Sequence, residues 1–201
     1  MSATASQTTK RGESLQHFTI AYNVLEAIIA IAAGQLASSV SLISFGLDSL
    51  IEVSASLLAL GLLRQRISEL TAQRGISISL YALAAWTAYE SLEHIMVGET
   101  SERSLAGLLI AIASVFVMPW LSREKKKVAT TLNSAALAGE AKQTDFCFYL
   151  SVILLLGMSA QWLLGWNQVD AVAALLMTPI LIAEARRTWR GESCCGGTSC
   201  H

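Results

Sequence analysis

Two carboxylates lie four residues apart inside an otherwise apolar stretch of the chain. Asp48 and Glu52 fall within Ser41–Leu63, which is long enough to cross a bilayer as a helix at about 1.5 Å per residue. Four residues advance a helix by about 400°, so the two side chains share one face. A charged side chain at membrane depth costs about 2.5–3.5 kcal/mol on insertion scales, and like charges also repel. The pair therefore predicts an interior or wet site that neutralises a cation.

A third acid, Asp145, lies in a later apolar segment at a comparable predicted depth. The segment with Asp48 and Glu52 is expected to run inward and the segment with Asp145 outward, which places Asp145 and Glu52 in the same middle zone. Three oxygen-bearing side chains, completed by water or a fourth side chain, are about what a divalent cation needs. The alternative is that these acids only hydrogen-bond to neighbouring helices, but intramembrane ionisable groups usually serve a function.

The composition indicates a polytopic membrane protein. Hydrophobic residues make up 53% of the 201 residues and charged residues only 14%, whereas soluble domains carry about 25%. The formal net charge of −1 argues against a nucleic-acid partner. We expect an all-α membrane protein with transmembrane helices at roughly 17–36, 40–63, 76–97, 104–121, 134–165 and 168–188. A disordered cytoplasmic arm at 1–14 and a Cys-rich cytoplasmic tail at 191–201 would flank the six-helix domain, 15–190.

The basic residues predict the orientation of these helices, because cytoplasmic loops are enriched in Lys and Arg. Loops on one side of the membrane are basic, and those on the other, such as Gly34–Ser39 and Gly165–Val169, are nearly free of positive charge. Both termini are therefore expected to be cytoplasmic. The basic residues on that side are Lys10, Arg11, Arg64, Arg66, Arg74, Arg123, Lys125, Lys126, Lys127, Arg186, Arg187 and Arg190. Small residues in the first two helices predict close helix contact.

The second apolar segment resembles the second helix of cation diffusion facilitator transporters. That family's signature there is D-x-x-x-D, and this chain has Asp48-x-x-x-Glu52 within SSVSLISFGLDSLIEVSAS. The stretches TDFCFYLSVILLLG and VDAVAALLM are similar to the family's fifth and sixth helices. The resemblance covers roughly residues 15–190, as a short form with only the transmembrane domain. It implies a metal/proton antiporter that exports zinc or a related divalent ion, with no tightly bound cofactor and often as a homodimer.

The chain departs from the family at the fifth helix, where the family usually has H-x-x-x-D. Aligned on Asp145, the histidine position holds Ala141. Without imidazole the case for Zn²⁺ weakens, and an all-oxygen site suits harder ions such as Mn²⁺ or Fe²⁺, with Co²⁺ and Cd²⁺ also possible. Glu140 lies about 140° round the helix from Asp145 and is not expected on its face. Lys142 either keeps Asp145 charged or, as we prefer, reaches the cytoplasmic interface.

The first helix adds Asn23 and Glu26, three residues apart and so on one side. By the same resemblance, the family often has a polar residue here close to the transport site. Glu26 would then supply a fourth ligand or carry a proton. For Asn23, a hydrogen bond to a neighbouring helix is an equally good explanation. Cys147 is expected to be a small apolar filler.

The tail GESCCGGTSCH holds three thiols and an imidazole: Cys194, Cys195, Cys200 and His201. Cytoplasmic thiols stay reduced, so metal binding is preferred to a disulfide. Adjacent cysteines are not a standard zinc-finger spacing, which leaves surplus reactive thiols as the alternative. A metal-capturing tail would stand in for the cytoplasmic domain that the short form lacks.

The leading expectation is a transporter in a bacterial inner membrane, and two other functions are possible from the sequence. The protein could be a non-transporting metal sensor or accessory subunit that acts through its tail. The sequence gives little support for an enzymatic function, because it has no Ser/His/Asp set, H-E-x-x-H motif or glycine-rich phosphate loop.

Overall fold

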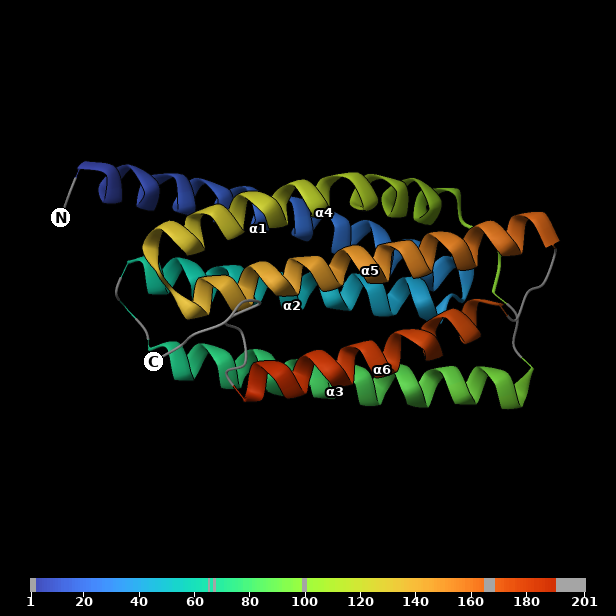
Figure 1. Cartoon of the computed structure of the whole chain (residues 1–201). Coiled ribbons are helices and arrows are strands. Elements are labelled where there is room, and N and C mark those ends of the chain that lie inside the picture. The colour runs from blue at the N-terminus through green and yellow to red at the C-terminus, as the bar shows by residue number, and fades with distance from the viewer. Residues whose placement is uncertain (1–2, 65, 67, 99–100, 165–168, 191–201) are drawn as a thin grey trace.

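The computed structural model describes residues 3–64, 66, 68–98, 101–164 and 169–190, and the regular elements in these ranges are α-helices. Consecutive helices run in opposite directions, so that α1 begins and α6 ends at the same end of the bundle (Figure 1). This confirms an all-α fold. The helices are α1 (Ala3–Ala37), α2 (Val40–Leu63), α3 (Glu69–Val97), α4 (Leu105–Leu132), α5 (Ala135–Leu164) and α6 (Val169–Trp189).

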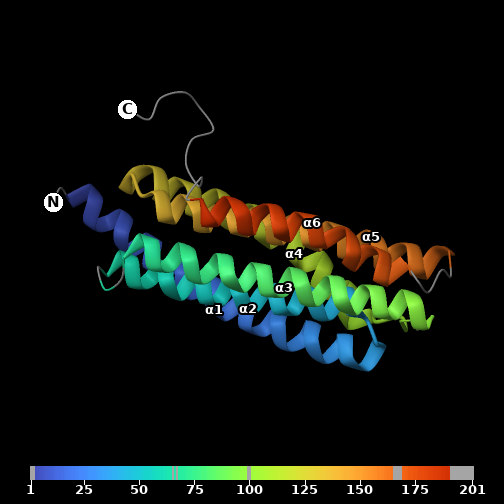
Figure 2. The ribbon, with the colours of Figure 1, turned by 90° about the horizontal axis from the view of Figure 1, so that it is seen from below.

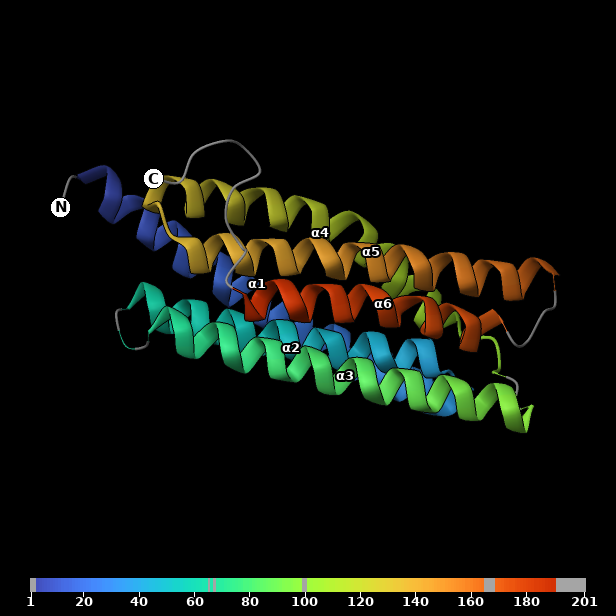
Figure 3. The ribbon, with the colours of Figure 1, turned by 60° about the horizontal axis from the view of Figure 1, so that its bottom comes forward.

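The six helices form two layers of three, with α1, α2 and α3 in one layer and α4, α5 and α6 in the other (Figure 2). Each helix of one layer packs on a helix of the other, in the pairs α1–α4, α2–α5 and α3–α6. The middle helices, α2 and α5, therefore have neighbours on several sides, and α2 contacts α1, α3, α5 and α6 (Figure 3). Polar residues placed between α2 and α5 are shielded by the rest of the bundle.

Serine N-caps begin α2 and α4, and a glycine C-cap ends α3. The Ser39 hydroxyl accepts a hydrogen bond from the Leu42 N–H at 3.2 Å and starts α2, whose bounds match the prediction. Ser104 caps α4 in the same way through the Gly107 N–H at 3.1 Å. The C-terminal end of α3 is capped by Gly98, which adopts a left-handed φ of 76° that a glycine accommodates without strain.

Helices α1, α3 and α4 are longer than predicted. The arm at 1–14, expected to be disordered, is helical from Ala3, and its polar side chains pair with the bundle: Arg11 with Glu124, and Glu13 with Arg64 at 3.4 Å. Helix α4 continues past 121 to Leu132, so the basic run 123–127, which the sequence predicts in a loop, is helical. Lys, Glu and Arg are good helix formers, and packing against α5 sustains the extra turns.

The close helix contact predicted from small residues is confirmed between α1 and α2. A Cβ at Gly46 would lie 2.7 Å from Ile31 Cγ1, and a Cβ at Gly34 would lie 2.7 Å from Ile43 Cγ1. Only glycine permits this approach. The tight contact holds α1 against α2 along the stretch that also carries Glu26.

Four helices, α1, α2, α4 and α5, contain stretches long and apolar enough to cross a membrane, judged on the described residues. Large apolar side chains cover the outside of the bundle, among them Leu25, Ile28, Leu109, Phe116 and Leu156, each more than half exposed. An apolar exterior around a polar interior is the arrangement that a bilayer favours.

Candidate metal site

The two acids of α2 are buried inside the bundle, as their positions in the sequence predicted. Asp48 is 3% exposed and Glu52 is 1% exposed. They belong to a polar face of α2 that continues at helical spacing, with Ser41, Ser44, Ser49 and Ser56 also buried. A face of this kind inside a membrane-spanning helix is costly to insert and marks an interior polar site.

Glu52 is held by two side chains from the opposite layer. Its Oε1 accepts a hydrogen bond from the Thr144 hydroxyl of α5 at 2.5 Å and another from the Lys125 ammonium of α4 at 3.2 Å. Its Oε2 has no hydrogen-bond partner among the described residues. One oxygen of this buried carboxylate is therefore saturated while the other remains available.

Lys125 is the centre of a buried polar cluster that consists of Lys125, Glu52, Glu140 and Thr144. It is 2% exposed, although it lies in a run of three lysines that the sequence placed in a loop. Its ammonium donates to Glu52, to Glu140 Oε1 and, at 2.9 Å, to the Thr144 hydroxyl. A buried charge needs partners of this kind, because desolvation without them is very unfavourable.

Glu140 joins the cluster from α5 and is 5% exposed. Besides Lys125, it accepts hydrogen bonds from the Gln16 amide of α1 at 3.2 Å and from the Ser56 hydroxyl of α2 at 3.4 Å. Glu140 thus connects four helices. Its spacing from Thr144 and from buried Cys147, four and seven residues, places all three on the face of α5 that meets α2.

Asp145 lies beside this face, not on it. Its side chain is 31% exposed, and its carboxylate accepts hydrogen bonds from Ser122 and Lys126 of α4, both at 2.5 Å. In the part of the chain that the structure describes, no three His, Cys, Asp or Glu side chains gather closely enough to hold a metal ion. The structure therefore brings Glu52 together with Lys125, Glu140 and Thr144, and it bonds Asp145 to α4.

Glu26 forms a second polar cluster between α1, α2 and α4. It is fully buried and accepts hydrogen bonds from Ser49 at 2.8 Å and from Ser114. The Tyr22 hydroxyl lies 3.0 Å from that of Ser114. Asn23 bonds to the Thr19 carbonyl of its own helix at 3.0 Å, and not to a neighbouring helix, while its Oδ1 has no hydrogen-bond partner among the described residues.

Lys125, Glu140, Thr144 and the buried Glu184 of α6 were not among the predicted site residues. For Lys125 a signal existed, since Leu121, Lys125 and Val128 follow helical spacing and all three are buried. For α5, the family motif points to Asp145 and the position of Ala141, and not to Glu140 or Thr144. The predicted ligands Cys194, Cys195, Cys200 and His201 lie outside the described residues.

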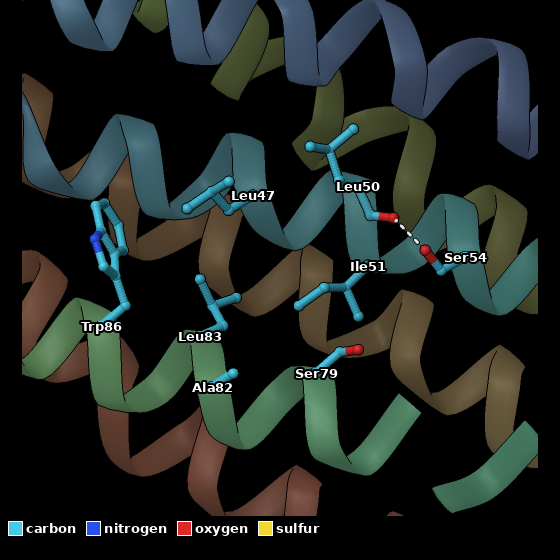
Figure 4. A pocket seen from close by; sticks show the side chains of 8 residues that line it. All are labelled: Leu47, Leu50, Ile51, Ser54, Ser79, Ala82, Leu83 and Trp86. Carbon is cyan, nitrogen blue, oxygen red and sulfur yellow. Dashed lines mark hydrogen bonds between the residues drawn. The ribbon is translucent and has the colours of Figure 1, made fainter. Parts of the chain in front are cut away.

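A groove of about 380 Å³ lies between α2 and α3, away from the buried acids (Figure 4). Leu47, Leu50 and Ile51 line one wall, and Leu83 and Trp86 line the other. Its two hydroxyl groups, on Ser54 and Ser79, donate to carbonyls of their own helices at 3.1 Å. The lining carries no charge, so the groove is unsuited to a cation.

Comparison with known proteins identifies the family. The model of the cation efflux transmembrane domain matches residues 17–191. A protein of Methanocaldococcus jannaschii named as an uncharacterised transporter is 28% identical over 181 residues, which cover 83% of this chain and 62% of that relative. The chain thus spans less than two thirds of the relative's length. With its helical bundle and apolar exterior, the chain is an integral multi-pass membrane protein and belongs to the cation efflux family.

Proposed function

We propose that this protein carries a divalent transition-metal cation across the membrane, out of the cytoplasm and in exchange for protons. The observation that carries the proposal is the pair Asp48 and Glu52, buried on one face of the central helix of a membrane bundle. Intramembrane acids of this kind mark ion pathways. Membership of the cation efflux family supports the same class of cargo.

The chemistry of the buried groups supports an ion that accepts oxygen ligands. Asp48, Glu52, Glu26 and Glu140 supply carboxylates, and the described histidines, His17 and His94, lie on α1 and α3 outside these clusters. Carboxylates suit Mn²⁺, Fe²⁺ and Co²⁺ better than softer ions, although zinc is the family's usual cargo by resemblance. We therefore propose zinc or a related transition metal. Asp145 and Asn23 stay predictions as ligands.

The burial of these acids supports the proposed proton exchange. Metal ions and protons compete for the same carboxylate oxygens, so binding of the metal releases protons. Protons that return from the far side would in turn displace the metal. Each half of the cycle uses the same oxygens, which gives coupling without a separate proton path.

The direction rests on the distribution of charge. Except for Arg103, which precedes α4 at the opposite end, the described basic residues lie at the end of the bundle where α1 begins and α6 ends (Figure 1). By the positive-inside rule we propose that this end faces the cytoplasm of a bacterial cell. Glu140 and Lys125 lie nearer this end than Asp48, so an ion entering from the cytoplasm would meet them first. Pairing of two copies in the membrane is proposed from the family alone.

Metal flux into proteoliposomes that carry a pH gradient tests this function. Zn²⁺, Mn²⁺, Fe²⁺, Co²⁺ and Cd²⁺ should be tried in turn, with the parent beside Asp48→Asn. Glu93→Gln, at an exposed acid of α3, is the matched control. We expect gradient-driven flux in the parent and control and its loss in Asp48→Asn. If folded protein shows no flux with any of these ions, the proposal is contradicted. The alternative of a non-transporting metal sensor that acts through its tail is then favoured.

A further inference from the structure

The ammonium of Lys125 is held by oxygens in the way that a bound metal ion would be. An ammonium offers three donors, and here they meet Glu52 Oε1 at 3.2 Å, Thr144 Oγ1 at 2.9 Å and Glu140 Oε1. These oxygens come from α2 and α5, and the ammonium from α4. A cation on a flexible stem thus fills an oxygen-lined space at the interface of the two layers.

The charges of this cluster do not balance. Two carboxylates, Glu52 and Glu140, share one ammonium, and the other polar neighbours, Thr144, Gln16 and Ser56, are neutral. The remaining oxygen of Glu52 has no hydrogen-bond partner among the described residues, although Glu52 is almost fully buried. A buried acceptor without a donor and a surplus negative charge both favour a second positive charge at this place.

We propose that Lys125 is a built-in cation that occupies the oxygen site of the resting protein, and that the transported divalent ion displaces it and takes Glu140 and Glu52 as ligands. A divalent ion brings two positive charges to two carboxylates, which the ammonium alone cannot do. Ammonium and metal would repel each other at this separation, so they exclude one another. This inference rests on the proposed function, and it adds Glu140 and Lys125 to the site.

The proposal requires the Lys125 ammonium to leave toward the charged end of α4. It lies in the part of α4 that is rich in charge, where Glu124 pairs with Arg11 and Lys127, and Lys126 pairs with Asp145. A lysine stem can extend along the helix and carry its ammonium to water at this end. The competing explanation is that Lys125 permanently fastens α4 to α2 and α5. The two explanations differ in what a metal does to Lys125.

Equilibrium binding of Mn²⁺ to the purified full chain in nanodiscs separates them. If Lys125 occupies the site more than nine tenths of the time, Lys125→Gln should tighten Mn²⁺ binding by about tenfold or more, because the apparent Kd scales inversely with the fraction of empty sites. Glu140→Gln should weaken it by about tenfold. Lys127→Gln removes an exposed neighbouring charge that pairs with Glu124 and should leave the Kd within about twofold of the parent. Unchanged or weaker binding in folded Lys125→Gln overturns the proposal.

A measurement on the parent protein covers the case in which Lys125→Gln fails to fold. Lysine amines are reductively methylated with and without saturating Mn²⁺, and each site is quantified by mass spectrometry. Lys125 should be protected without metal and at least about fivefold more reactive with it, if displacement brings the amine to water. Exposed Lys127 should react equally in both conditions. Continued protection of Lys125 at saturating Mn²⁺ overturns the proposal.

The two failures can be told apart. A parent that neither binds Mn²⁺ nor carries any tested ion contradicts the proposed function itself. A parent that transports a divalent ion while Lys125 stays protected contradicts only the displacement of Lys125 and leaves the transporter in place.

Discussion

The contact between α1 and α2 at Gly46 allows a direct test of how tightly the bundle is packed. In Gly46→Ala the new Cβ would lie 2.7 Å from Ile31 Cγ1 and 3.1 Å from both Ala30 Cβ and the Ile31 backbone nitrogen. Because one of these neighbours is backbone, rotation of a side chain cannot relieve the clash. The two helices must separate by a few tenths of an ångström.

Overpacking of this kind costs about 1–3 kcal/mol of unfolding free energy. Gly75→Ala is the matched control, since a Cβ there meets no atom within 4 Å on the exposed start of α3. There the substitution should stabilise by about 0.4–1 kcal/mol, through reduced freedom of the unfolded chain. The two alanine variants should therefore differ by roughly 1.5–4 kcal/mol, in opposite directions from the parent.

Separation of α1 from α2 would also strain the polar cluster around Glu26. The Ser49 hydroxyl of α2 donates to Glu26 of α1 at 2.8 Å, within one turn of Gly46. Reversible unfolding in mixed micelles would give the free energies, and metal flux in proteoliposomes would report the site. Gly46→Ala should lose both stability and flux, whereas Gly75→Ala should keep its flux. A Gly46→Ala variant as stable as the parent would show that the α1–α2 contact is looser than the structure indicates, and would refute this reasoning.

Other substitutions and conditions test the remaining groups. Glu52→Gln should lower metal flux by roughly tenfold to a hundredfold, because it removes a buried negative charge, and flux like that of the parent would exclude Glu52 from the site. Asp145→Asn should lower metal flux by roughly tenfold, as expected of a predicted ligand, and flux within about threefold of the parent would exclude Asp145, whose carboxylate is part-exposed and bonded to α4. Affinity for Mn²⁺ should fall as the pH is lowered, because protons and metal compete for the same carboxylates, and a Kd independent of pH would contradict proton exchange. Deletion of residues 191–201 should raise the metal concentration needed for half-maximal flux, and an unchanged concentration would refute metal capture by the tail.

Much of the fold could be predicted because apolar segments of fixed length leave few alternatives in a bilayer. The bounds of α2 agreed with the prediction, and α5 and α6 agreed within one residue. The errors lie where a helix leaves the apolar zone. Hydropathy could not show that α4 continues to Leu132 or that α1 starts at Ala3, because tertiary contacts such as Arg11 with Glu124 sustain those polar turns.

Half of the candidate site was predictable and half was not. Asp48 and Glu52 stood out because an acid within an apolar run needs an explanation. Composition does not separate Lys125 from Lys126 and Lys127. Helical spacing from Leu121 does, but only if the helix is known to continue past residue 121, which hydropathy does not show. On α5, the family motif aligned on Asp145 selected a residue one position away from Thr144, and one position changes the facing direction by about 100°.

Pro119 lies inside α4 and interrupts its hydrogen bonding. Proline has no N–H, so the Val115 carbonyl lacks its usual partner within the helix, and bending is easier there than elsewhere along α4. On one side of this weak point Ser114 contacts Glu26, and on the other Lys125 contacts Glu52. Bending at Pro119 would move one polar cluster relative to the other while each half of the helix stays rigid. Pro119 thus lies between the two groups of buried acids, at the point where α4 bends most easily.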